Sequence, residues 1–238
     1  MPQSLQSRIA IHRIKDAMLL EGRVVDNATH AHHAMQVTWA VGEPARLSLD
    51  EPLTGGIVVI EGGVRHALRL ERGVVCLLEP QGEVAQGIRQ RWLRGEASVV
   101  RERPVESCDP EELFASLSHH AAPRKGDPRV THVLDWLDQL EEQGRWREAE
   151  LSSAARRVHL SASRFRHLFA ERVGSSWRSY IRWRRALVAT KLALEGKGLT
   201  QAAHAAGYAD SAHLSRQFKE LFGFTPSSAV GFSRFVQG

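Results

Sequence analysis

Apolar positions in the first half of the chain form short runs that end at turns. "MQVTWAV" (35–41), "GGIVVI" (55–60) and "VVCLL" (74–78) are each followed within a few residues by Gly. Short β-rich segments about ten residues apart with such turns are typical of a sandwich or barrel. We therefore expect a small β-barrel between residue 23 and about residue 103.

The pattern changes to a helical period after Pro110. "EELFASLSHH" (111–120) predicts a short helix with an apolar stripe of Leu113, Phe114 and Leu117, and "AAPRKGDP" (121–128) reads as a linker. The stripe could pack on the barrel of its own chain or join two chains, and we expect a dimer formed by residues 1–120. Nearly everything from Pro128 to about residue 230 has helical period, interrupted by single glycines. The expected fold is α+β with two domains: residues 1–120 form the barrel and its terminal helix, 121–127 the linker, and 128–238 an all-α domain.

The helical half contains an internal repeat. Shifted by 49 residues, "SAARRVHLSASRFRHLFAERVG" (153–174) aligns with "AAHAAGYADSAHLSRQFKELFG" (202–223), and Ala154 falls on Ala203. Each copy reads as an Ala-rich helix, a tight turn, a capping residue and a longer second helix. This is the layout of a helix-turn-helix, whose second helix enters the major groove of DNA. The repeat therefore predicts two such motifs.

The segment between the two copies predicts a long helix. Residues 175–196 contain no Pro and no interior Gly. About 20 residues at ~1.5 Å rise span ~30 Å, close to the ~34 Å between successive major grooves on one face of DNA. We expect this helix to hold the two recognition helices one turn of DNA apart, with Arg178, Arg182, Arg184 and Arg185 available to phosphates.

The charge distribution agrees with a polyanionic partner. Residues 1–120 hold 13 Lys/Arg against 16 Asp/Glu, whereas residues 121–238 hold 19 against 11. A basic half joined to a mildly acidic half favours nucleic acid as the partner of the basic half. No apolar run approaches the ~20 residues of a membrane span, and no secretion signal is present. We expect a cytoplasmic protein without membrane association, in which Cys76 is a reduced core thiol rather than a partner of Cys108.

Residues 127–230 resemble the DNA-binding domain of the AraC/XylS family of bacterial transcription regulators. The second motif, "LTQAAHAAGYADSAHLSRQFKELFGFTPS" (199–227), is close to the signature of that family, and Arg185, Ala189 and Leu192 fit its linking helix. Trp177 stands where many members have Pro or Phe. The resemblance implies a sequence-specific regulator that works with RNA polymerase, forms a homodimer and responds to a small-molecule effector.

The face of each second helix that is turned away from its apolar side carries the candidate base readers. The candidates are Ser163, Arg166 and His167 in the first motif and Ala212, His213, Ser215 and Arg216 in the second. The base-contacting positions of the family fall on these residues, apart from Ser215. Arginine pairs with guanine through two hydrogen bonds, so Arg166 and Arg216 are the strongest candidates. Arg164, Arg182 and Lys219 are expected to contact phosphates.

The first half partly resembles the metal motif of cupin barrels. His30 and His32 alternate along a strand, Gln36 stands at the usual acidic position, and "GGVRH" brings His66 about thirty residues later. Imidazoles two residues apart on a strand share a face, so these three histidines are candidate ligands of a divalent metal. His33 is expected to point outward. The same barrel could instead bind an organic effector without metal, or serve only in dimerisation or partner contact.

Two other classes of function remain open at this stage. A cupin-type sensor or enzyme domain could be fused to the DNA-binding module, although the chain has no recognisable Ser/His/Asp set, phosphate loop or carboxylate pair. A nonspecific DNA-packaging protein would also be basic. We expect a regulator that is not an enzyme, whose cofactor, if any, is unknown.

Overall fold

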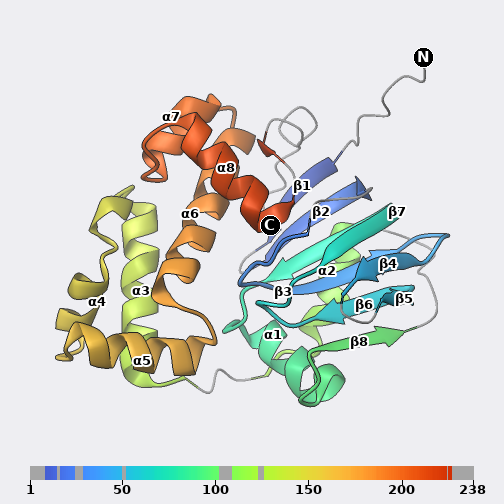
Figure 1. Ribbon diagram of the computed structural model, residues 1–238, viewed down its shortest axis with the longest axis horizontal. Coiled ribbons are helices and arrows are strands. Elements are labelled where there is room, and N and C mark those ends of the chain that lie inside the picture. The colour runs from blue at the N-terminus through green and yellow to red at the C-terminus, as the bar shows by residue number, and fades with distance from the viewer. Residues whose placement is uncertain are drawn as a thin grey trace. The chain divides into compact units, whose positions relative to one another are not determined.

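The computed structural model describes residues 9–14, 17–24, 29–49, 52–101, 109–122, 126–223 and 225–226 of the 238-residue chain. The chain divides into two compact units, residues 1–123 together with 218–238 and residues 124–217, which are described one at a time (Figure 1). The helix that spans residue 217 is described with the helical unit. No helix in the described ranges is long and apolar enough to span a bilayer.

The N-terminal unit is built on an antiparallel sheet. The strands are β1 (Ile9–Ile14), β2 (Ala17–Val24), β3 (Met35–Ala40), β4 (Ala45–Ser48), β5 (Leu53–Gly55), β6 (Ile57–Ile60), β7 (Ala67–Leu78) and β8 (Ser98–Arg101). The path of the sheet runs β1-β2-β7-β3-β6-β8, with β4 pairing both β7 and β5. Among the described strands this path is open, because no pairing joins its two ends, so the structure shows a sheet where the sequence predicted a barrel.

The long strand β7 organises this sheet. Its 12 residues pair with β2, β3 and β4, and Val37 of β3 lies opposite Cys76. Side chains alternate between the faces of a strand, so Met35, Val37 and Trp39 share one face, and Gln36 and Thr38 the other. The first face carries the core of the unit, which continues into the helical segments that follow β7. Cys76 is a free, fully buried thiol, as predicted, and burial raises its pKa. Cys108 lies outside the described residues.

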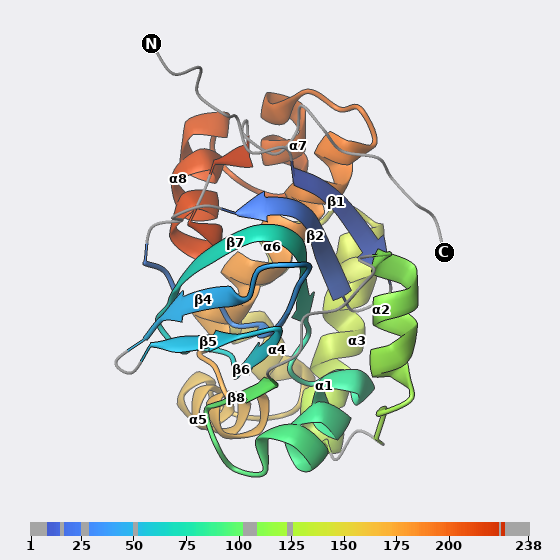
Figure 2. The same ribbon diagram turned by 90° about the vertical axis from the view of Figure 1, so that its right-hand side faces the viewer.

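Three short helical segments cover the apolar face. They are α1 (Glu83–Ile88), the π-helical turn η1 (Arg89–Leu93) and α2 (Pro110–Ser118), and Figure 2 shows α1 and α2 beside the sheet. The side chain of Asp109 caps α2 by accepting hydrogen bonds from the backbone N–H groups of Glu111 and Glu112, both at 2.9 Å.

The apolar stripe of α2 packs against its own sheet. Phe114 and Leu117 belong to the core with Val37 and Cys76, and Leu113 packs against it. Leu117 is only 1% exposed, so this side chain is not available to a second subunit. The stripe is packed in the core of its own unit, so a dimer formed by residues 1–120 must use a different surface.

The C-terminal unit is helical, as predicted. Its segments are α3 (Pro128–Glu142), the 3-10 turn η2 (Trp146–Glu148), α4 (Leu151–Arg157), α5 (Ala162–Val173), α6 (Trp177–Leu194), α7 (Leu199–Ala205) and α8 (Ser211–Phe222). One apolar core extends from Val130 of α3 to Leu214 of α8. Within it the Trp177 ring lies edge-on to Phe165 and Phe169, with centroids 5.6 and 5.0 Å away. An aromatic residue at position 177 thus completes the packing between α5 and α6.

Candidate DNA interface and histidine cluster

The two helix pairs α4/α5 and α7/α8 share the same local backbone geometry. Each first helix has seven residues, and the turn after it contains one left-handed residue, His159 (φ 54°) or Gly207 (φ 80°). One residue later the backbone N–H of Leu160 donates to Ala155, at 3.0 Å, just as the N–H of Tyr208 donates to Ala203, at 2.8 Å. These matching turns make both pairs helix-turn-helix motifs.

The repeat is not uniform in length. The first helices and their turn residues correspond with a shift of 48 residues, whereas α5 and α8, each of 12 residues, correspond with a shift of 49. The second turn is therefore one residue longer than the first. The sequence-based pairing of Ala154 with Ala203 is wrong by one position, because a single shift cannot absorb an insertion within the turn.

Both second helices begin with a side-chain cap. The Ser161 hydroxyl accepts from the backbone N–H of Arg164 at 3.3 Å, and the Asp210 carboxylate accepts from that of His213 at 2.6 Å. Such caps satisfy backbone N–H groups that would otherwise lack a partner at the helix start. The pKa of Asp210 is lowered, chiefly by this backbone hydrogen bond. Each recognition helix thus has a fixed N-terminus.

The candidate base readers differ in exposure. Phe165 and Phe169 of α5 and Leu214 and Phe218 of α8 are buried, so the apolar faces point inward as predicted. Of the candidates, Ser163, Arg166, His167, Ala212 and Arg216 are exposed, whereas His213 and Ser215 are partly buried. In the shift of 49, Ser163 corresponds to Ala212, Arg166 to Ser215 and His167 to Arg216. The two arginines therefore stand at neighbouring, not identical, positions of their helices.

His213 is held by neighbours within its own motif. Its ring is edge-on to Tyr208, with centroids 5.4 Å apart, and its Nε2 lies 2.8 Å from Nε2 of Gln217. One ring nitrogen of His213 is therefore engaged before any DNA is bound. Among the predicted phosphate contacts, Arg164 and Lys219 are exposed and Arg182 is half-buried.

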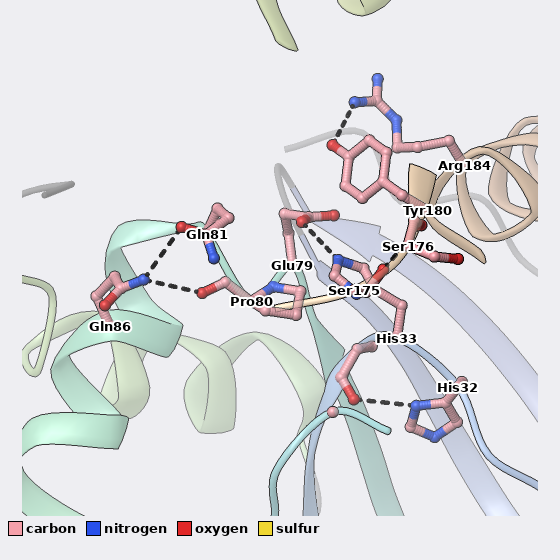
Figure 3. Close-up of polar contacts among 12 residues, drawn as sticks. His32, His33, Glu79, Pro80, Gln81, Gln86, Ser175, Ser176, Tyr180 and Arg184 are labelled. Carbon is pink, nitrogen blue, oxygen red and sulfur yellow. Dashed lines mark hydrogen bonds and ion pairs between the residues drawn. The ribbon is translucent and has the colours of Figure 1, made fainter. Parts of the chain in front are cut away.

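Two of the four arginines on α6 hold the unit together. Arg184 donates to Asp138 and Glu141 of α3, both at 2.7 Å. It also donates to the Tyr180 hydroxyl at 3.3 Å (Figure 3). Arg185 donates through Nε to the carbonyl of Ala206 at 2.8 Å. The sequence left all four as possible phosphate contacts, whereas the guanidinium groups of Arg184 and Arg185 are engaged inside the fold. Arg178 is exposed.

Comparison with known proteins agrees with this geometry. A family model described as a helix-turn-helix domain matches residues 154–230. The C-terminal region is an AraC-type helix-turn-helix domain. The chain is a DNA-binding transcription regulator. A search of curated protein sequences found no match.

Solved structures of ToxT from Vibrio cholerae have a similar fold over nearly the whole chain. One ToxT structure aligns with a TM-score of 0.52 at 12% identity and covers 92% of this chain and 98% of its own. ToxT bound to an unsaturated fatty acid aligns with a TM-score of 0.52 at 14% identity and covers 98% of both chains. ToxT bound to (E)-4-(8-methylnaphthalen-1-yl)but-3-enoic acid also aligns with a TM-score of 0.52, at 12% identity, and covers 91% of this chain and 99% of its own. At these identities the likeness concerns the fold.

Beyond the AraC-type domain, the N-terminal unit contains a cluster of three buried histidines. His30 and His66 form an isolated antiparallel bridge. The backbone N–H of His30 donates to the carbonyl of His66, with 3.0 Å between nitrogen and oxygen, and that of His66 donates to the carbonyl of His30 at 2.9 Å. One ligand atom from each of His30, His32 and His66 lies within 4.8 Å of the others, and all three residues are at most 6% exposed. The structure thus brings together the three residues that the sequence singled out.

A close backbone approach holds the two segments of this cluster together. The N–H of Gly63 donates to the carbonyl of His32 at 2.8 Å, and a Cβ added to Gly62 would lie 2.0 Å from the carbonyl oxygen of His33. Glu61 accepts the Gly62 N–H at 3.0 Å and two guanidinium N–H groups of Arg89 at 2.6 and 2.9 Å. The sequence analysis did not predict the Glu61–Arg89 pair. The close backbone approach could have been predicted, because Gly62 and Gly63 closely follow the end of a strand.

His33 does not point outward. The residue is 7% exposed, and its Nε2 lies 3.3 Å from a carboxylate oxygen of Glu79 (Figure 3). The prediction of a surface histidine assumed regular strand alternation, but β3 begins only at Met35, so residues 30–34 do not follow it. His33 is therefore a buried polar partner of Glu79 rather than part of the three-histidine cluster.

Proposed function

We propose that the AraC-type domain reads two successive major grooves of DNA, one with α5 and one with α8. The observation that supports this most directly is the duplicated motif with capped second helices whose apolar faces are buried. Base contacts are assigned to Ser163, Arg166 and His167 and to Ala212, His213, Ser215 and Arg216. The 18 residues of α6 span about 27 Å at ~1.5 Å per residue, a length compatible with two grooves on one face of the duplex.

Phosphate contacts are assigned to Arg164, Lys219 and Arg182. The first two side chains are exposed on the same helices as the base readers, whereas Arg182 is half-buried on α6. Contacts of this kind position the protein without reading sequence, so their loss weakens binding to every duplex.

The test uses the full chain and a site selected from random duplexes. Specific binding should exceed nonspecific binding by at least ~10³ and fall steeply with salt. Arg166→Ala and Arg216→Ala should each relax preference at particular base pairs, by roughly 1–3 kcal/mol. Arg172→Ala is the matched control, because Arg172 is an exposed arginine at the far end of α5. If the two variants lose specific and nonspecific affinity in equal proportion, the assignment of base readers is wrong.

For the N-terminal unit, residues 1–120, we propose an effector-binding role. The support is the shared fold with ToxT, whose structures contain a fatty acid or a naphthalene-bearing carboxylic acid. A screen of organic carboxylates by thermal shift tests this, because a ligand that binds only the folded state raises the melting temperature. No shift with any organic ligand, together with a shift in divalent metal, would favour the alternative of a metal-binding sensor domain.

Self-association and contact with RNA polymerase are further parts of the proposal. Joining two DNA-binding units raises the effective concentration of the second, which favours a homodimer at paired half-sites. With the stripe of α2 buried in its own core, the dimer surface must lie elsewhere in residues 1–120. Sedimentation of the full chain tests self-association: a monomer at tens of micromolar would contradict it.

A further inference from the structure

The three-histidine cluster has a defined arrangement of ring protons. Nδ1 of His32 lies 3.0 Å from the carbonyl oxygen of Ala34, and Nδ1 of His66 lies 3.0 Å from that of Val64. A carbonyl oxygen can only accept a hydrogen bond, so Nδ1 carries the proton in both rings. In the neutral form of each ring, Nε2 therefore presents a lone pair.

These lone pairs converge on the side chain of Gln36. Its Oε1 lies 3.2 Å from Nε2 of His32 and 3.2 Å from Nε2 of His66, while its Nε2 donates to the Thr38 hydroxyl at 3.1 Å. In this arrangement neither imidazole can donate to the amide oxygen, so three acceptor atoms face one another inside the protein. A cation placed between these acceptors would be attracted by all three of them.

The third histidine closes the cluster. The His30 ring centroid lies 4.4 Å from that of His66 and 5.6 Å from that of His32, and the backbone bridge between His30 and His66 fixes their spacing. Zn–N bonds of about 2.0–2.1 Å place tetrahedral ligand nitrogens roughly 3.3 Å apart, so closing the cluster around an ion requires ring movements on the order of 1 Å.

We propose that His30, His32 and His66 bind one divalent first-row transition metal ion, with Gln36 Oε1 as a fourth ligand. Imidazole nitrogen suits zinc, nickel, iron and copper, whereas magnesium and calcium prefer sets of oxygen ligands. The backbone carbonyls of Ala34 and Val64 act as outer partners, because a ligating histidine ordinarily donates its other ring N–H to such a group and is thereby held in one tautomer. The site does not depend on the DNA-reading proposal, and either can fail without the other.

A metal-free arrangement is the competing explanation. If the Gln36 amide is reversed, its NH₂ group donates to both Nε2 atoms and its oxygen accepts from the Thr38 hydroxyl. All polar atoms of that group are then satisfied without an ion, since amide oxygen and nitrogen are interchangeable in shape. The two arrangements differ in one measurable property: only the first binds metal.

The experiment uses untagged full-length protein stripped with a chelator and titrated with Zn²⁺ or Co²⁺ alone. We expect one ion per chain by calorimetry, and visible d–d absorption of the Co²⁺ form. His66→Ala should weaken binding by more than the roughly 10–100-fold lost when only an outer partner is removed. His12→Ala is the matched control, because His12 pairs with Glu21 on a neighbouring strand, and it should bind as tightly as the wild type.

A second variant covers the case in which His66→Ala does not fold. Gln36→Glu replaces a neutral ligand by a charged one of the same size, so it should tighten Zn²⁺ binding at pH 7. X-ray absorption of the zinc-loaded wild type should show scattering from three imidazole rings. Absence of stoichiometric binding in the wild type, or binding that His66→Ala leaves intact in a folded protein, overturns the proposal in favour of the reversed amide.

Discussion

The guanidinium carbon of Arg185 lies 4.4 Å from the centroid of the Tyr208 ring. From the same position Arg185 donates to the carbonyl of Ala206. One side chain of the linking helix α6 thus contacts both sides of the left-handed turn at Gly207, and the turn leads directly into α8. This contact therefore joins α6 to the turn that precedes the second recognition helix.

Replacing Arg185 should loosen the second motif. Arg185→Gln removes the contact with the ring and weakens the hydrogen bond to Ala206, and we expect a loss of about 1–3 kcal/mol in the free energy of unfolding. Urea unfolding of the full chain measures this loss. Arg178→Gln is the control, because Arg178 is exposed on the same helix. Equal stability of the two variants would mean that Arg185 does not orient the turn.

The two turns should respond differently to substitution. A non-Gly residue in the left-handed region costs roughly 1–2 kcal/mol. Gly207→Ala should therefore destabilise the protein by about that amount, and its Cβ would also lie 3.4 Å from that of Trp146. His159→Gly relieves the same strain in the first turn, but glycine loses more conformational entropy on folding, which opposes this gain. The variant should therefore be neutral or more stable by less than ~1 kcal/mol. A drop in the melting temperature of His159→Gly as large as that of Gly207→Ala would contradict this.

The Glu61–Arg89 pair should make the N-terminal unit sensitive to acid. Burial alone raises the pKa of Glu61, but the hydrogen bonds and charge of Arg89 outweigh it and lower the pKa below its ordinary value of 4.5. Below that value the unfolded chain binds a proton that the folded chain does not, so stability is lost as the pH falls.

Thermal unfolding between pH 7 and pH 3.5 tests this dependence. In Glu61→Gln the loss of stability below pH 4.5 should be smaller than in the wild type, whereas Glu43→Gln, at an exposed position, should follow the wild type. Identical acid profiles of Glu61→Gln and the wild type would show that the pair contributes nothing to folding.

Truncation of Leu117 should destabilise the protein through its own core. A fully buried leucine replaced by alanine typically costs about 2–5 kcal/mol. We expect Leu117→Ala to fall in this range and Leu113→Ala, at a half-buried position, to cost less. Calorimetric unfolding of both variants measures the difference. A Leu117→Ala protein of wild-type stability that loses self-association would restore the interface role of this stripe.

The sequence predicted elements whose signal is local. The two motifs, the long helix between them and the buried faces of Phe165, Phe169, Leu214 and Phe218 follow from apolar period and from glycine or capping residues, all of which act within a few residues. The association of His30, His32 and His66 was predicted from the likeness to the cupin metal motif, although residues 30–34 precede β3 and do not follow strand alternation.

Other features depend on contacts between distant residues, which a single sequence does not show. The roles of Arg184 and Arg185 required knowledge of which helices approach α6, and charge alone made both look like phosphate contacts. His33 was misplaced because its segment precedes the regular strand. The open sheet, in place of a barrel, depends on strand order, and local patterns contain no information about that.

The most direct test of the account is guanine-methylation interference on a selected site bound by the full chain. Methylation of guanine N7 blocks the major-groove edge that arginine reads. The account predicts two patches of interference on one face, roughly 10–10.5 bp apart. It further predicts that Arg166→Ala removes interference at particular guanines in one patch and Arg216→Ala in the other. A single patch, or two variants that weaken both patches equally, would contradict the reading of two grooves by α5 and α8.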